Sequence, residues 1–255
     1  QATLITHWMR VGFIHGVMNT DNMALSGETI DYGPCAFMDA YAAGTVFSSI
    51  DRNGRYSYAN QPPIAQWNLA RLAETLLPLI HQDGDTATTM AEEKLKNFTQ
   101  LYQQKWLAMM RRKLGLFGEQ EGDETLATDF LNWMEQSNAD FTNTFRDLSQ
   151  TNLPQKELYQ QKDFLAWYHR WQNRLAQNTE PLQASTDLMH ATNPVIIPRN
   201  HNVEEALEAA VHGNITPCRD LLDALKTPYT GEKNQRPYQA PPTPEQRVYQ
   251  TFCGT

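Results

Sequence analysis

A short segment near the start of the sequence gathers side chains that can bind metal ions and move protons. It reads HGVMNTDNMALSGETIDYG and covers residues 15–33. Asn22 lies seven residues after His15, and Asp31 follows Asn22 by nine residues at the head of an Asp-Tyr-Gly triplet. Amide and carboxylate oxygens are hard ligands, and such pairs hold the Mg²⁺ ions of phosphoryl-transfer sites. The spacing therefore predicts Asn22 and Asp31 as metal ligands.

The segment departs from the protein kinase pattern at the position of the catalytic base. In the kinase sequence H-R-D-L-x-x-x-N the Asp follows the His by two residues, and here that position is Val17. Asp21, directly before Asn22, could act as a displaced general base, which suits attack at the α-phosphate of a nucleotide. For His15 we favour a structural role, in which it braces the loop by hydrogen bonding. Asp and Asn are also common turn formers, so these residues alone leave the site open.

Helices and one small β element are expected to position this segment. An apolar stripe from Leu4 to Phe13 predicts a helix that ends near Gly16. Residues 23–25 and 29–30 are predicted to form short strands around a turn. Residues 33–63 contain many turn formers and are predicted to be a long ordered loop, which in a compact domain is usually functional.

The rest of the chain is predicted to be helical, so the fold class is mainly α. We expect residues 1–150 to form the catalytic domain and residues 151–255 to form a helical extension packed on it. Tryptophans spaced among apolar residues are expected in the core. They are Trp67, Trp106, Trp133, Trp167 and Trp171. The predicted helices span residues 64–80, 86–114, 123–134, 142–148, 154–175, 203–211 and 217–225, and residues 229–244 are expected to be extended.

Composition narrows the classes of function. The formal net charge is −8, which argues against a nucleic-acid partner but permits a nucleotide, because a bound cation can bridge acidic groups to phosphates. No apolar run approaches the roughly 18 residues of a membrane span. Three cysteines without a CxxC pair indicate a reducing, cytoplasmic setting. The sequence begins with Gln in a segment that is already helical, so we expect it to be part of a longer protein.

Longer strings give a much more specific signal. They are HGVMNTDNM, TIDYGP, NQPPIAQWNLARLAETL, KLGL (residues 113–116), DFTNTFRDLS (140–149) and NPVIIPRNH (193–201). The chain resembles the selenoprotein O family of pseudokinases, and the likeness continues to Tyr229. This resemblance implies a kinase-like C-lobe and a bacterial, cytoplasmic enzyme that binds ATP in a flipped orientation and transfers AMP to Ser, Thr or Tyr hydroxyls of proteins.

The resemblance also assigns roles to single residues. Asp21 matches the family's proton acceptor, and Asn22 and Asp31 match its ligands for Mg²⁺, with Mn²⁺ as an alternative. Asp31 also lies against the nucleotide phosphates in the family. The family's phosphate-binding Lys and its Glu partner lie upstream of the catalytic loop, so we expect the N-lobe to be absent and ATP binding by this chain to be weak. Two alternatives stay open: phosphoryl transfer to protein, and an inactive helical binding fragment.

Further expectations concern residues outside the catalytic segment. Cys253 occupies the family's selenocysteine or cysteine position, but its usual redox partner is replaced by Phe47, which leaves Cys35 as a candidate only if the two Cα atoms come within about 7 Å. Residues 60–62 are expected to fix the loop beneath the site. Asp39 and Asp51 are expected to be solvated. The spacing of His190, His201 and His212 does not predict a zinc site.

Overall fold

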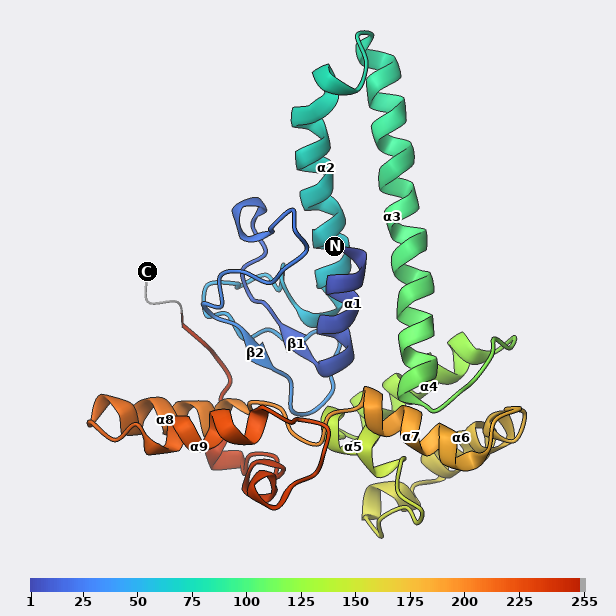
Figure 1. The fold of residues 1–255 in the computed structure, drawn as a ribbon, viewed down its shortest axis with the longest axis vertical. Helices are drawn as coiled ribbons and strands as arrows, with labels where there is room; N and C mark the ends of the chain where they lie inside the picture. Colours follow the sequence, from blue (N-terminus) through green and yellow to red (C-terminus); the bar gives the residue numbers. More distant parts are fainter. Residues whose placement is uncertain (253–255) are drawn as a thin grey trace.

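The chain folds mainly as α-helices, as predicted, and the described residues contain one two-stranded sheet (Figure 1). The computed structural model describes residues 1–252. The helices are α1 (Ala2–Val11), α2 (Gln61–Ile80), α3 (Gly84–Lys113), α4 (Asp123–Gln136), α5 (Phe141–Asp147), α6 (Lys162–Leu175), α7 (Leu182–Thr192), α8 (Asn200–Val211) and α9 (Thr216–Leu225). The strands are β1 (Phe13–Ile14) and β2 (Ala36–Phe37), and 3₁₀ turns cover Thr20–Asn22, Tyr58–Asn60, Glu157–Gln160, Lys233–Tyr238 and Pro244–Gln246.

The sheet forms elsewhere than the sequence predicted. Helix α1 ends at Gly12, whose φ of 73° is left-handed and whose backbone N–H bonds to the Trp8 carbonyl, so Phe13 does not continue the helix. Strand β1 pairs antiparallel with β2. Of the hairpin expected between residues 23–25 and 29–30, only one antiparallel bridge forms, between Met23 and Thr29.

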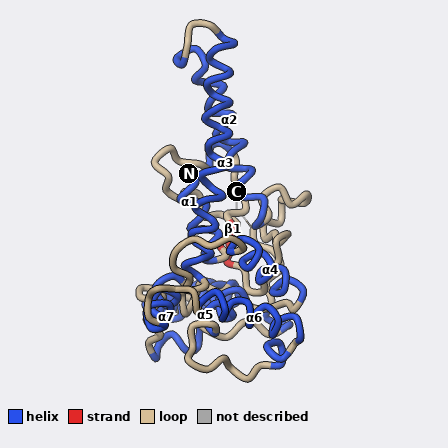
Figure 2. Tube along the Cα trace, turned by 90° about the vertical axis from the view of Figure 1, so that its right-hand side faces the viewer, coloured by secondary structure: helices blue, strands red, loops and turns tan. Residues whose placement is uncertain are grey.

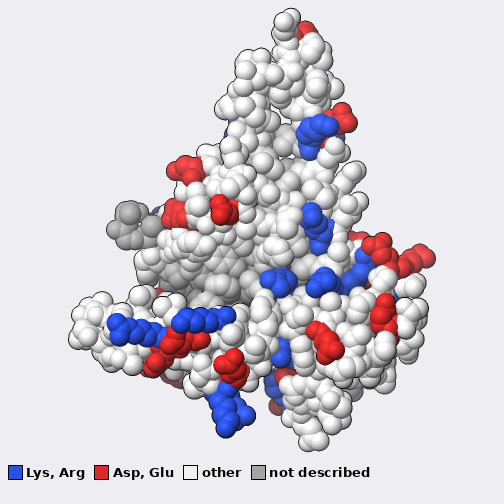
Figure 3. Space-filling view, in the orientation of Figure 1, with Lys and Arg blue, Asp and Glu red and all other residues white. Residues whose placement is uncertain are grey.

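Helices α2 and α3 form a long hairpin that projects from the rest of the molecule (Figures 1 and 2). Helix α2 begins at Gln61, three residues earlier than predicted, because Pro62 and Pro63 fit the first helical turn, where no backbone N–H is needed. The Asp83 carboxylate caps α3 by accepting a hydrogen bond from the Thr86 N–H at 2.8 Å. In the view of Figure 3 most of the hairpin surface is uncharged, and charged side chains gather near the base of the molecule.

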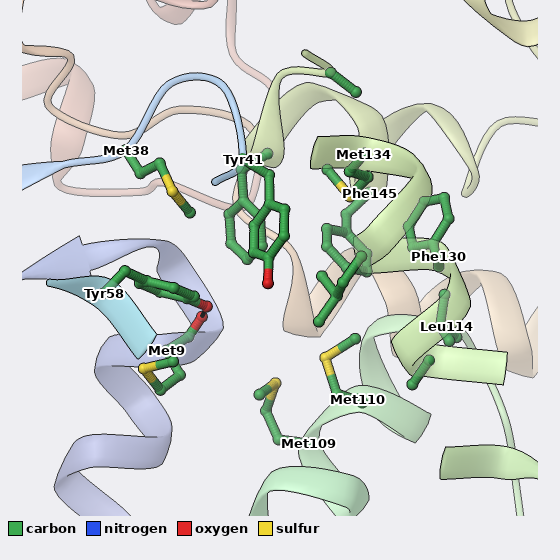
Figure 4. Close-up of a cluster of buried hydrophobic side chains, with 14 of the residues drawn as sticks. Met9, Met38, Tyr41, Tyr58, Met109, Met110, Leu114, Phe130, Met134 and Phe145 are labelled. Carbon is green, nitrogen blue, oxygen red and sulfur yellow. Dashed lines mark hydrogen bonds between the residues drawn. The ribbon is translucent and has the colours of Figure 1, made fainter. Parts of the chain in front are cut away.

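An aromatic core joins α1, the base of α3, and helices α4 to α6. Figure 4 shows the part of it that extends from Met9 of α1 to Phe130 of α4 and Phe145 of α5. The ring centroids of Phe130 and Trp167 stack at 4.0 Å, and Trp133 and Trp171 are also buried, as predicted. Trp106 is half-buried. The prediction for Trp67 was wrong, because this side chain is 41% exposed. Its ring lies between the guanidinium groups of Arg55 and Arg71, at 4.7 and 5.2 Å, which is favourable at an aqueous surface.

The C-terminal part differs most from the prediction. Helix α7 was not predicted, and the helix expected over residues 154–175 is divided into a 3₁₀ turn and α6. Helices α8 and α9 pack together beside a small cluster of Val195, Ile196 and Ala224. The following chain returns to the body of the molecule, where Thr251 forms a parallel bridge with Ser48. Cys253 lies outside the described residues.

A buried ion-pair cluster corrects the expectation for Asp39. Its carboxylate pairs with Arg199, whose side chain is 1% exposed and also bonds Asp140 at 2.8 Å. Arg199 lies 160 residues from Asp39 along the chain, so no local pattern of residues indicates this contact. Asp51 is also half-buried, and it accepts hydrogen bonds from the backbone N–H groups of Arg55 and Tyr56. No helix in the described part of the chain has the length and apolar character to cross a membrane.

Candidate active site

Asp21 and Asn22 lie on the 3₁₀ turn Thr20–Asn22, which follows β1. The Asn22 backbone N–H donates to the Asn19 carbonyl at 3.0 Å, and its side-chain Nδ2 donates to the Val17 carbonyl at 3.0 Å. Because the amide nitrogen is engaged, the Asn22 Oδ1 atom is directed away from Val17. The Asp21 side chain is exposed. The turn therefore presents an amide oxygen and a carboxylate from adjacent residues.

Asp31 is exposed and has a left-handed backbone, with a φ of 55°. Such a conformation is uncommon for a residue other than glycine and costs on the order of 1–3 kcal/mol unless the surroundings impose it. Here the preceding carbonyl, of Ile30, is held by His15 Nε2 at 2.7 Å. The Met23–Thr29 bridge also joins the chain just after Asn22 to the chain just before Asp31. These contacts bring the two predicted metal ligands onto one short, doubly anchored segment.

His15 braces this segment, as its sequence context suggested. The side chain is fully buried, and its Nδ1 atom accepts a hydrogen bond from the Val17 backbone N–H at 3.4 Å. The hydrogen of the neutral ring is therefore on Nε2, and this N–H donates to the Ile30 carbonyl. Burial lowers the pKa of His15 below its ordinary value of 6.5, although the Ile30 carbonyl and Asp31 act in the opposite direction. A neutral, buried ring with both nitrogens engaged is a structural support.

Two polar side chains of helix α2 form hydrogen bonds with the backbone of residues 13–18. Gln61 is fully buried; its Oε1 accepts from the His15 N–H at 3.0 Å, and its Nε2 donates to the Phe13 carbonyl at 2.9 Å. Of residues 60–62, Gln61 makes these contacts, whereas the Asn60 side chain donates to the Gly54 carbonyl at 2.8 Å. Asn68, which the sequence analysis did not single out, donates from Nδ2 to the Met18 carbonyl at 3.0 Å. The signal for Asn68 in the sequence was a polar residue placed among the apolar residues of the predicted helix.

The loop after Asp31 contacts residues 15–33 in two places. The Tyr56 hydroxyl donates to Asn19 Oδ1 at 2.6 Å, so Asn19 connects to the loop instead of to Asp21. Gly16, with a φ of 83°, packs so closely that a Cβ there would lie 3.0 Å from the Pro34 carbonyl oxygen. The close approach explains why glycine occupies this position.

The donor set fits a divalent cation that keeps some of its ligands from elsewhere. Among the described residues there is no group of three or more His, Cys, Asp or Glu side chains that could enclose a metal. Neither Asp21 nor Asp31 forms an ion pair with another residue in the range 1–252, so both carboxylates face solvent. Mg²⁺ is typically bound by one or two protein oxygens together with water and substrate phosphates. Asn22 and Asp31 match that arrangement.

Comparison with known proteins identifies the family. The family model described as protein adenylyltransferase SelO matches residues 1–226. The chain belongs to this family. Relatives named protein nucleotidyltransferase YdiU, from Nitrosococcus oceani, Alcanivorax borkumensis and Alkaliphilus metalliredigens, are 58%, 55% and 54% identical to it over 256 residues. These alignments cover all of this chain and 52%, 53% and 52% of the relatives. The chain thus spans about half the length of the curated relatives it matches, and the resemblance seen in the sequence is confirmed.

Proposed function

We propose that this chain carries the base and the metal ligands of an active site that transfers AMP from ATP to Ser, Thr or Tyr hydroxyls of proteins. One observation carries the proposal: a single braced segment presents the oxygens of Asp21, Asn22 and Asp31 to solvent. Membership in a family described as protein adenylyltransferase supports the same reaction. The names of the relatives, protein nucleotidyltransferases, agree with it.

Each residue has a defined role in the proposed reaction. Asp21 accepts the proton of the substrate hydroxyl, whose oxygen attacks the α-phosphorus while the bond to pyrophosphate breaks. Asn22 and Asp31 would hold Mg²⁺ (or Mn²⁺), and Asp31 would lie next to the nucleotide phosphates. A bound Mg²⁺ supplies neutralisation of the phosphate charge. His15 keeps Ile30, and with it Asp31, in place without taking part in proton transfer.

We also propose that residues 1–150 correspond to a kinase-like C-lobe and residues 151–255 to a helical extension packed on it. The order of elements supports this proposal: a helix, a catalytic turn, the Asp-Tyr-Gly triplet, a long loop and a long helix follow one another. The main core cluster includes Tyr159 and Trp167 as well as residues before 150, so the extension contributes to the same core. A cytoplasmic location in a bacterium is proposed from Cys35 and Cys218, which are unpaired within the described range.

Labelled ATP tests the reaction. The full-length gene product is incubated with acceptor protein and ATP labelled at the α- or the γ-phosphate, and the label retained on protein is measured. We expect retention of the α-label alone; retention of the γ-label would indicate phosphoryl transfer and overturn the proposal.

Variants of the site test the residue roles in the same assay. Asp21→Asn is expected to lower the rate by about 10²–10⁴-fold, the usual contribution of a general base. Asp31→Ala is expected to abolish transfer, whereas the control Asp163→Asn, at an exposed position on α6, should leave it unchanged. Normal activity of the Asp31 variant would remove Asp31 from the site.

A further inference from the structure

A cavity of about 380 Å³ lies at the base of the α2–α3 hairpin. None of the residues 15–33 lines it, so it is separate from the candidate active site. Its size is within the range that small-molecule sites occupy. Most of its wall consists of apolar and aromatic side chains from α1, the loop before α2, and α3. They include Met9, Tyr41, Tyr58, Phe98, Tyr102 and Trp106.

Two of the three phenol hydroxyls in this wall have no partner. The Tyr58 hydroxyl donates to the Met9 carbonyl at 2.7 Å. The hydroxyls of Tyr41 and Tyr102 make no hydrogen bond to any residue in the described part of the chain, although Tyr41 is only 8% exposed. In Figure 4 the Tyr41 hydroxyl points toward the side of the core where Met9 and Met109 lie. Neither hydroxyl oxygen is among the fully buried polar atoms that lack a partner, so both keep contact with water, and a ligand carbonyl would replace that water as the acceptor.

Both phenols are donors at neutral pH. Burial raises the pKa of Tyr41 to about 12, and Glu135 contributes in the same direction. Burial and the nearby Tyr41 ring raise the pKa of Tyr102 as well. No Lys, Arg, Asp or Glu lines the cavity. A charged ligand would therefore lose its hydration without gaining a counter-charge.

We propose that this cavity binds a small neutral molecule that combines a flat apolar ring with one carbonyl acceptor. The ring packs between the aromatic walls, where offset or edge-on contacts are favourable. The carbonyl accepts a hydrogen bond from Tyr41 or Tyr102. The three requirements of ring, acceptor and neutrality can be tested separately with simple compounds.

The first experiment compares three probes on the 255-residue chain carrying ¹³C-labelled methionine methyl groups. Acetophenone has ring and carbonyl, ethylbenzene lacks the carbonyl, and benzoate is charged. We expect acetophenone to shift the methyl resonance of Met9, which lines the cavity, with a Kd on the order of 1 mM, and to leave Met189 on α7 unchanged. Ethylbenzene should bind about three- to tenfold more weakly. Equal binding of all three probes, or no shift at Met9, would overturn the proposal.

The second experiment uses variants that remove the phenol hydroxyl donors and a variant that fills the cavity. Tyr41→Phe and Tyr102→Phe keep the rings and remove one hydroxyl each. The variant that lacks the hydroxyl bonded to the carbonyl should bind acetophenone about three- to tenfold more weakly and bind ethylbenzene with unchanged affinity. Thr99→Trp, at a half-buried position of the wall, should abolish binding of both probes. Tyr249→Phe, at an exposed tyrosine outside the cavity, is the control. Unchanged acetophenone affinity in both the Tyr41 and the Tyr102 variant would contradict the proposed hydrogen bond.

Discussion

Gln61 and His15 show how uncharged side chains hold the candidate site. Both are fully buried: Gln61 joins the start of α2 to the backbone of residues 13–15, and His15 joins the backbone of Val17 to that of Ile30. Gln61 uses its donor on Phe13 and its acceptor on His15, so one side chain satisfies two backbone groups that water cannot reach. The exposed oxygens of Asp21 and Asp31 depend on this uncharged support.

Replacing Gln61 by Leu should destabilise the fold. Leu has a similar volume but leaves the His15 N–H and the Phe13 carbonyl buried without partners, at about 1–3 kcal/mol each. We expect a loss of about 2–4 kcal/mol in the free energy of unfolding, measured by urea denaturation. Gln100→Leu, at an exposed position of α3, is the matched control and should change stability by less than about 0.5 kcal/mol. A loss of that small size for Gln61→Leu would contradict the role of the side chain.

The lowered pKa of His15 predicts a dependence of stability on pH. Burial lowers the pKa in the folded state below the unfolded value of 6.5, so near pH 6 the unfolded chain binds more protons. Stability should therefore be full above pH 6.5 and fall as the pH decreases below it. Urea denaturation of the wild type and of His15→Gln at pH 7.5 and 5.5 measures this effect. We expect a smaller loss in the variant. Some loss should remain, because burial also lowers the pKa of His7, His190 and His201, and equal losses would contradict the prediction.

The residues of the candidate site were more predictable than their supports. Asn22 and Asp31 were proposed from spacing and Asp21 from its place directly before Asn22, and their roles stay predictions. Asn68 was missed because its contact with the catalytic segment spans 50 residues and depends on how α2 packs. The solvated state expected of Asp39 was wrong for the same reason.

At the scale of elements, Asp123 at the start of α4 joins three helices. Its carboxylate bonds Arg174 Nε of α6 at 2.6 Å and Arg111 Nε of α3 at 2.7 Å, and its side chain is 1% exposed. The cluster fixes the base of α3 against α4 and α6. Arg111 lies in the last turn of α3, where its charge also complements the helix dipole.

Asp123→Asn should therefore lower the free energy of unfolding by weakening the packing of α3 against α4 and α6. Removing one partner of a buried ion pair leaves an uncompensated charge, here on Arg174, which is 7% exposed, at a cost of about 3–5 kcal/mol. Thermal or urea unfolding measures the loss. Glu124→Gln, at the adjacent exposed position of the same helical turn, should cost less than about 1 kcal/mol. Similar losses for both variants would show that the ion pairs are not responsible.

The elements themselves were predictable where the local signals agreed. Helices α2 and α3 have apolar periodicity and clear boundary residues, and their predicted bounds lie within a few residues of the observed ones. Helix α7 was missed because it buries only Ser185, Met189 and Thr192, which give no apolar stripe. The β1–β2 sheet was missed because strands of two residues are too short to show alternation.

At the scale of the whole molecule, the segment near Thr251 fastens the C-terminal part to the loop after Asp31. The Thr251 N–H donates to the Phe47 carbonyl at 2.7 Å, and the Ser49 N–H donates to the Thr251 carbonyl at 3.0 Å. The Thr251 hydroxyl also bonds the Pro34 carbonyl, beside the Asp-Tyr-Gly triplet. These contacts connect two regions that no helix joins.

Thr251→Pro removes two donors from this contact, because proline has neither a backbone N–H nor a hydroxyl. We expect amide exchange at Ser49 to accelerate at least about tenfold, the effect of losing about 1.4 kcal/mol of local stability. Thr251→Ser keeps the N–H and the hydroxyl and should exchange like the wild type. Hydrogen exchange followed by NMR measures both. Unchanged protection in the proline variant would mean that the loop is ordered without this segment.

The contact at Thr251 also has a consequence for biosynthesis. Its two sides lie 217 residues apart along the chain, between Pro34 and Thr251. At usual rates of translation of about 5–20 residues per second, the ribosome needs about 10–40 s to make the second side after the first. During that interval residues 15–33 have been made without the segment near Thr251, which later bonds the neighbouring loop. The loop therefore gains its contacts with Thr251 only when synthesis of these 255 residues is nearly complete.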